Sequence, residues 1–118
     1  MDSQHIKDEA VLALEDIKAK DIEVLDVHRI TSLCDYMIIA SADSTRQTKA
    51  LAHNVEDRLR EKGVPIQGLE GERTGEWILV DLGAVVVHVM QPAAREYYNL
   101  SELWGGTWRP QLRAASSG

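Results

Sequence analysis

Two short runs rich in β-branched residues, Glu76 to Val80 and Val85 to Met90, are joined by only four residues, Asp81 to Ala84. A join this short predicts an antiparallel β-hairpin. If Val80 pairs with Val85, alternate side chains separate onto two faces. One face would carry only β-branched residues: Ile78, Val80, Val85, Val87 and Val89. This face is expected to receive the helices, so the hairpin determines which side of the sheet forms the core.

The opposite face of the predicted hairpin has a different composition. It would carry Trp77, Leu79, Asp81, Val86, His88 and Met90. Trp and Met are enriched at recognition surfaces, whereas Lys and Glu are depleted there. The pattern therefore predicts a solvent-facing binding surface around Trp77. The alternative is that Trp77 only shields the sheet, with His88 satisfied by local contacts. The residues that could cover Trp77 are Tyr97, Tyr98 and Trp104.

Two helices are predicted, and a third, short one is suggested after Pro92. They cover residues 3–19, 44–63 and 92–95. Apolar residues at three- and four-residue spacings indicate the first helix, with Asp2 or Ser3 as its N-cap. Ser44 followed by Gln47 is a capping-box pattern that marks the start of the second helix. Gly63 marks the end of that helix.

Further strands are predicted over residues 22–27 and 36–42, and a weaker one over 65–69. Together with the hairpin they predict an α+β fold, in which a mixed β-sheet of four or five strands is flanked by helices. One domain is expected over residues 1–104. Residues 105–118 lose periodicity and are predicted to form a loosely ordered tail.

The composition limits the partners of the chain. Its 118 residues include 19 acidic and 13 basic side chains, which give a formal net charge of −6. This balance argues against neutralisation of phosphates as the main source of affinity, so little direct nucleic-acid binding is expected. No apolar stretch is long enough to span a bilayer, and no membrane partner is expected. A single cysteine, Cys34, and an acidic N-terminus without a signal-peptide pattern predict a cytoplasmic location.

Signals for catalysis or metal binding are weak. The histidines are scattered, and none has the helical spacing that brings two imidazoles to one metal: His5, His28, His53 and His88. Cys34 could act as a nucleophile only with a base such as His28 close by. The glycines match neither a phosphate-binding loop nor a dinucleotide fingerprint. The sequence therefore predicts no metal, no cofactor and no catalytic residue.

Several short motifs occur in an order and spacing that resemble a known family. They are Leu25-Asp26-Val27, Thr31-Ser32, Asp35-Tyr36, Ser44 with Arg46-Gln47 and Ala50, Glu70-Gly71, Trp77, Asp81-Leu82-Gly83, Val87-His88-Val89, Arg95 with Tyr98, and Leu103-Trp104. Together they resemble the ribosomal silencing factor, or Iojap, family over about residues 11–104. The resemblance implies a nucleotidyltransferase-like fold without that catalysis, and the chain contains no Asp-x-Asp pair.

The resemblance also implies a function and a partner. Members of the family bind the large ribosomal subunit through ribosomal protein L-fourteen, block the joining of the small subunit and repress translation under nutrient limitation. A homodimer is possible in the isolated protein. Two other interpretations are a nucleotidyltransferase-like enzyme and a homodimeric interaction module unrelated to the ribosome.

The partner-binding residues that the resemblance implies lie mainly on the hairpin and near the end of the matched region. They are Glu70, Trp77, Asp81, His88, Met90, Tyr98 and Trp104. Trp77 is the expected anchor of the contact, because Trp is enriched among the residues that dominate binding energy. Asp81 and Glu70 are the expected partners of Arg or Lys on a basic ribosomal protein, which would attract an acidic domain.

Overall fold

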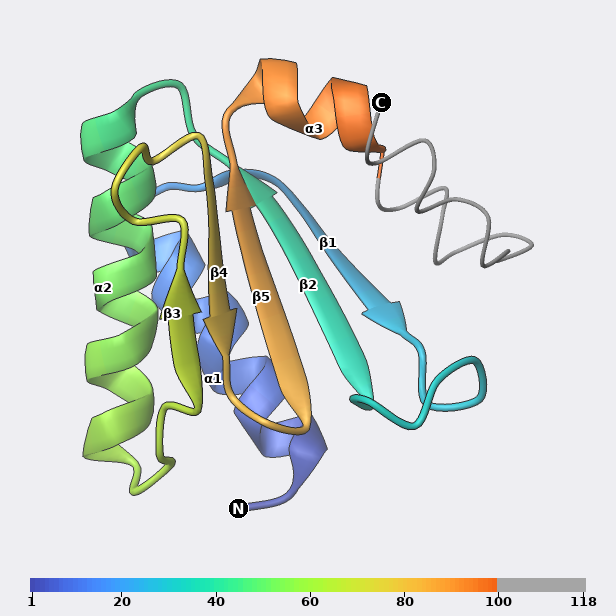
Figure 1. Cartoon of the computed structure of the whole chain (residues 1–118). Helices are drawn as coiled ribbons and strands as arrows, with labels where there is room; N and C mark the ends of the chain where they lie inside the picture. The colour runs from blue at the N-terminus through green and yellow to red at the C-terminus, as the bar shows by residue number, and fades with distance from the viewer. Residues whose placement is uncertain (100–118) are drawn as a thin grey trace.

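Three helices and five strands make up the computed structural model, which describes residues 1–99 (Figure 1). The helices are α1 (Ser3–Asp16), α2 (Thr45–Glu61) and α3 (Pro92–Tyr98). The strands are β1 (Lys20–Asp26), β2 (Tyr36–Ser41), β3 (Gly68–Glu70), β4 (Trp77–Asp81) and β5 (Val85–Met90). Each element lies at or next to a predicted segment. The predicted tail over residues 105–118 lies outside the described residues.

The N-caps of the two long helices form where the sequence predicts them. Asp2 Oδ1 accepts a hydrogen bond from the backbone N–H of His5 at 2.8 Å, and Ser44 Oγ accepts one from Gln47 at 3.1 Å. The first helix stops earlier than predicted. Lys18 adopts a left-handed φ of 61°, a conformation that ends helices, so α1 ends at Asp16 and β1 begins at Lys20.

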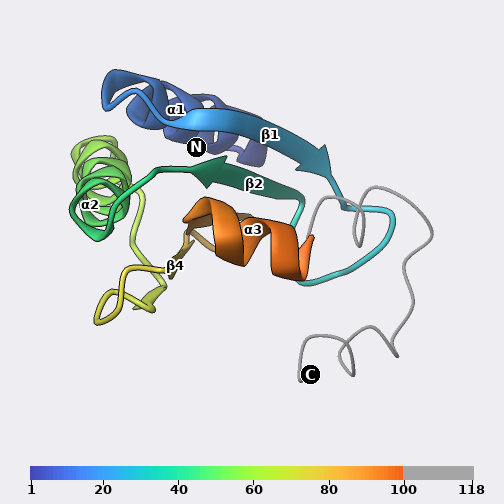
Figure 2. The same cartoon turned by 90° about the horizontal axis from the view of Figure 1, so that it is seen from above.

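The strands form one mixed sheet in the order β1-β2-β5-β4-β3. The β2–β5 pair is parallel and the other three pairs are antiparallel. Helices α1 and α2 cover one face, and α3 lies over the end of the sheet toward the other face (Figures 1 and 2). The predicted α+β fold with a mixed sheet is therefore confirmed.

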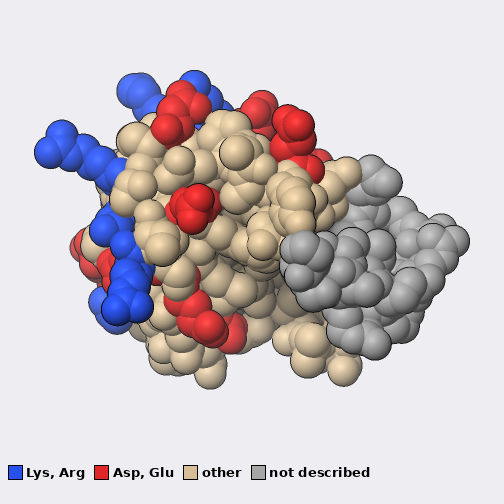
Figure 3. Space-filling view, turned by 45° about the horizontal axis from the view of Figure 1, so that its top comes forward, with Lys and Arg blue, Asp and Glu red and all other residues tan. Residues whose placement is uncertain are grey.

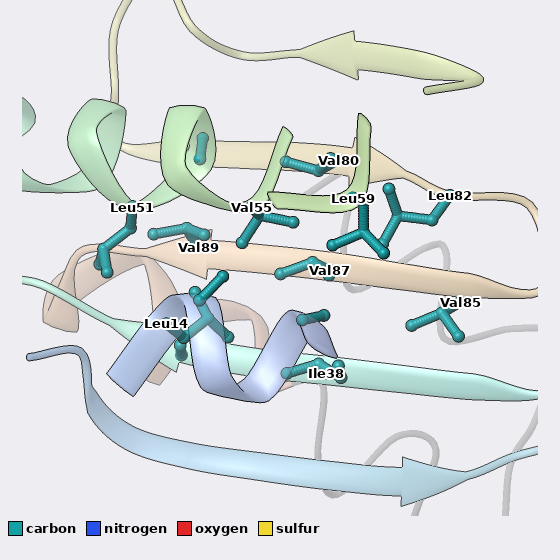
Figure 4. Packing of buried hydrophobic residues seen from close by; sticks show 14 of the residues in the cluster. Leu14, Ile38, Leu51, Val55, Leu59, Val80, Leu82, Val85, Val87 and Val89 are labelled. Atoms are coloured by element: carbon teal, nitrogen blue, oxygen red, sulfur yellow. The ribbon is translucent and has the colours of Figure 1, made fainter. Parts of the chain in front are cut away.

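The valine-rich face of the hairpin packs against α1 and α2, as predicted. Its five residues have no solvent exposure: Ile78, Val80, Val85, Val87 and Val89. Figure 4 shows the side chains that meet between helices and sheet, including Leu14 from α1 and Leu51, Val55 and Leu59 from α2. Alternation along two strands thus directs the main core to one side of the sheet.

The predicted register of the hairpin is wrong by two residues. Val80 pairs with Val87 instead of Val85, and Trp77 pairs with Met90 instead of His88. The turn is tighter than predicted: the backbone N–H of Leu82 donates to the carbonyl of Val85 at 2.9 Å. It is centred on Gly83, whose φ of 85° suits a two-residue turn. Because the shift is even, every side chain stays on its predicted face.

Candidate partner-binding site

The site consists of the residues of β4 and β5 that face away from α1 and α2, called here the Trp77 face. They are Trp77, Leu79, Asp81, Val86, His88 and Met90. A second apolar cluster lies on this side and includes Met90, Met37 and Ile39. Trp77, Val86 and Tyr98 pack against it and are half-buried. The face is thus a layer of partly exposed side chains above a small second core.

The position of Trp77 depends on a close backbone approach. Gly71 has a φ of 85°, and a Cβ there would lie 1.9 Å from the carbonyl oxygen of Trp77. Only glycine fits this conformation and this contact. The Glu70-Gly71 motif therefore holds the start of β4 against the end of β3, which fixes where the indole leaves the sheet.

The Trp77 indole donates a hydrogen bond from Nε1 to Nδ1 of His88 at 2.9 Å. The two side chains therefore project together from one face, as the alternation predicts. An acceptor Nδ1 in a neutral imidazole requires that Nε2 carry the proton. Nε2 is buried and has no hydrogen-bond partner among the described residues. The His88 ring thus orients the indole and cannot gain a second proton without losing this bond.

The prediction that this face is open to solvent at His88 and Met90 is wrong. His88 is 5% exposed and Met90 is 0% exposed. Met90 is covered because the second cluster and α3 lie over the end of the sheet at which β5 terminates. Burial also lowers the pKa of the His88 imidazole from 6.5 to about 4. These two residues support the surface from beneath, and Trp77 and Tyr98 are its accessible aromatic part.

The stability of the protein should depend on pH through His88. The unfolded imidazole takes up a proton near pH 6.5 and the folded one only near pH 4. Since the unfolded state then binds more protons, stability falls as pH drops through this window. We expect the free energy of unfolding to decrease by about 2 kcal/mol between pH 7.5 and 5. Urea unfolding at the two pH values measures the difference.

The matched variants for this prediction are His88→Gln and His53→Gln. The glutamine at position 88 cannot titrate, so most of the pH dependence should disappear. His53 is exposed on α2 and contacts Glu72, and its replacement should leave the part of the pH dependence that comes from His88 in place. An equal pH dependence in the wild type and in His88→Gln would show that another group is responsible.

Helix α3 carries Tyr98 and is held in place by polar contacts to α2, to the loop before β4 and to the sheet. At its N-cap, Gln91 Nε2 donates to Thr45 Oγ1 and to the carbonyl of Gly75, both at 3.1 Å. On its other side, Arg95 donates to Ser41 Oγ at 2.9 Å and pairs with Glu23 of β1. No residue of α3 is fully buried. These polar contacts therefore largely set the position of the helix.

The aromatic rings at this end of the sheet contact one another. The centroids of Trp77 and Tyr98 are 4.5 Å apart with a tilt of 47°, and Tyr97 meets Tyr98 edge to face at 4.9 Å. Both geometries are favourable for aromatic pairs. Tyr97 is 60% exposed. Sequence reasoning did not select Tyr97 for the site, although the helix signal at Pro92 combined with adjacent tyrosines could have indicated it.

The acidic residues predicted to contact a partner occupy different environments. Glu70 is exposed on β3 and lies opposite Leu79, on the Trp77 face. Asp81 is half-buried, and its Oδ1 accepts a hydrogen bond from Gly83 N–H at 2.8 Å. Asp81 thus stabilises the hairpin turn in addition to any contact with a partner. Trp104 lies outside the described residues.

The structure also bears on metal binding, on Cys34 as a nucleophile and on membrane spans. Within residues 1–99, no group of three or more His, Cys, Asp and Glu side chains could hold a metal ion. Burial raises the pKa of the Cys34 thiol, the opposite of what activates a nucleophile. No helix in the described part of the chain is long and apolar enough to cross a membrane.

The structure therefore shows a small α+β domain with a partly exposed aromatic cluster on the sheet face opposite its main core. Comparison with known families gives a more specific answer. Residues 1–117 match the family model described as ribosomal silencing factor during starvation. The chain belongs to this family, as its ordered motifs predict.

Individual relatives agree with the family match. The ribosomal silencing factor RsfS of Chromobacterium violaceum is 57% identical over 106 residues, which cover 90% of this chain and 87% of that protein. A mouse protein named mitochondrial assembly of ribosomal large subunit protein 1 is 35% identical over 100 residues, covering 82% of this chain and 44% of its own length. A crystal structure of a Chromobacterium violaceum protein superimposes with a TM-score of 0.88 at 55% identity, covering 92% of this chain and 91% of the other.

Proposed function

We propose that this protein represses translation under nutrient limitation by binding the large ribosomal subunit through ribosomal protein L-fourteen. Bound there, it blocks the joining of the small subunit. Family membership supports a role at the ribosome, and the name of the mouse relative refers to the large subunit. The observation that carries the proposal is the Trp77 face, where a half-buried indole and Tyr98 lie on the side of the sheet not covered by α1 and α2.

The charge of the chain favours a basic protein as the direct contact. The residues of β3, β4 and β5 on the Trp77 face include Glu70 and Asp81 and no Lys or Arg. In Figure 3, basic side chains gather on the side where α2 lies, whereas acidic ones occur in the middle of the face shown. Such a surface is attracted to a basic ribosomal protein and repelled by exposed RNA phosphates.

The proposed contact residues divide into two groups by exposure. Trp77, Tyr98, Glu70 and Asp81 are accessible to a partner. His88 and Met90 act from below, by orienting the indole and by filling the second cluster. We retain Trp104 among the proposed contact residues on the basis of the family motif.

The mode of action proposed is occlusion by binding, without catalysis. The chain is a member of a family of silencing factors, and a bound domain of this size on the subunit interface is a steric obstacle. We further propose that the protein acts in the cytoplasm and is able to form a homodimer in isolation, as the resemblance to the family implies.

A subunit-joining assay tests the proposed function directly. Purified small and large subunits are mixed with increasing amounts of protein, and joined particles are measured by sucrose-gradient sedimentation. At a free concentration of about a hundred times Kd, about 1% of large subunits stay unoccupied, so joined particles should nearly disappear. Preincubation with the small subunit alone, followed by its reisolation, should have no effect. Full joining at saturation would exclude occlusion.

A further inference from the structure

A groove lies between α3 and the start of β4, at the edge of the Trp77 face. Its volume is about 370 Å³, and the rings of Trp77, Tyr97 and Tyr98 line it. Thr74, Ala93 and Ala94 also line it. The groove is large enough for one extended side chain but small for a folded element. Its shape therefore suits a single projecting residue of a partner.

The lining combines aromatic rings with one carboxylate. Among residues 1–99, Glu76 lines the groove and no Lys or Arg does. Glu76 is exposed, and its carboxylate makes no hydrogen bond or ion pair within the described residues. An apolar occupant would remove water from this carboxylate without replacing its hydrogen bonds, which costs free energy. The charge of the lining thus favours a cation.

The cationic residue nearest to the groove along α3 belongs to another contact. Arg95 pairs with Glu23 and donates to the carbonyl of Asp21, on the β1 side of the helix. Its side chain is only 17% exposed. The guanidinium therefore holds α3 against β1 and does not neutralise Glu76.

We propose that this groove receives an arginine side chain of the partner protein. A guanidinium is planar, stacks on aromatic faces and donates hydrogen bonds to a carboxylate, whereas an ammonium is a strongly hydrated point charge. The Trp77, Tyr97 and Tyr98 rings supply the aromatic faces, and Glu76 supplies the acceptor. The inference deepens the proposed function, because it specifies the chemistry of one contact with the ribosomal protein.

The test uses three short peptides that differ at one position, acetyl-Gly-X-Gly-amide with arginine, lysine or citrulline as X. Binding is followed by the NMR shifts of the Trp77 indole N–H and of the backbone amides from Ala93 to Tyr98. Citrulline keeps the shape of arginine without its charge. We expect the arginine peptide to bind about five- to thirtyfold more tightly than the citrulline peptide, and more tightly than the lysine peptide.

Two matched glutamine variants locate the effect. Glu76→Gln should abolish most of the preference for arginine over citrulline. Glu96→Gln changes an acid of α3 that does not line this groove, and it should leave the preference unchanged. Equal binding of the arginine peptide with either of the other two would overturn the proposal. So would an unchanged preference in Glu76→Gln.

The peptide-binding experiment and the subunit-joining assay test the two proposals separately. If the protein blocks subunit joining but shows no preference for the arginine peptide, the proposed function stands and the arginine groove does not. If the arginine peptide binds as expected but joining is unaffected, the groove stands and the ribosomal function does not.

Discussion

Trp77→Ala should weaken binding to the large ribosomal subunit by about thirtyfold or more. Truncation of a central interface Trp typically costs over about 2 kcal/mol, which corresponds to that factor. The indole contributes its contact with Tyr98 and its hydrogen bond to His88, and both hold it in one orientation. Cosedimentation with isolated large subunits over a range of protein concentrations measures the change in Kd.

The control for this variant lies on the other side of the sheet. Val24 is 41% exposed on β1 and pairs with Ile38 of the main core. Val24→Ala should leave subunit binding within about twofold of the wild type, as expected for a position outside the contact. Trp77→Phe adds a check on folding, because it keeps a ring beside Tyr98 while removing the indole donor. Unchanged binding by a folded Trp77→Ala protein would exclude Trp77 as the anchor.

Leu14→Ala should lower the free energy of unfolding by about 2–5 kcal/mol, a large share of the stability of a domain this size. Leu14 of α1 is fully buried between the helices and the sheet (Figure 4). Its truncation loses buried apolar surface and leaves a cavity that the surrounding side chains fill only partly. Urea unfolding followed by circular dichroism measures the change in midpoint and slope.

The same substitution two residues earlier provides the control. Leu12 lies on α1 and is 42% exposed. Leu12→Ala makes the same chemical change without opening a core cavity, so its cost should stay below about 1 kcal/mol. Similar losses in both variants would contradict the assignment of the buried face of α1.

Local patterns in the sequence are sufficient to predict most of the helices and strands. Alternation along Trp77–Asp81 and Val85–Met90 assigned every side chain of the hairpin to its observed face. The Ser44 cap was predicted because its hydrogen bond to Gln47 joins residues only three apart. Such features depend on neighbours in the chain, and neighbours are visible in a sequence.

The register of the hairpin shows where local reasoning fails. Val80 pairs with Val87 because Gly83 turns the chain in two residues. A hairpin with a four-residue loop fits the alternation equally well, because its register and the observed one keep each side chain on the same face. A glycine permits the tighter turn without requiring it, so only the folded hairpin decides between the two.

Contacts between segments far apart in the sequence decide which side chains of the Trp77 face are buried. The sequence by itself determined the family, the class of fold and the two faces of the sheet, because these follow from periodicity and motif order. Only the tertiary structure placed His88 and Met90 under cover and brought Tyr97, Tyr98 and Glu76 around one groove. The reason is that α3 is positioned by Arg95 through Glu23, 72 residues earlier in the chain. No pattern among neighbouring residues encodes a contact of that range.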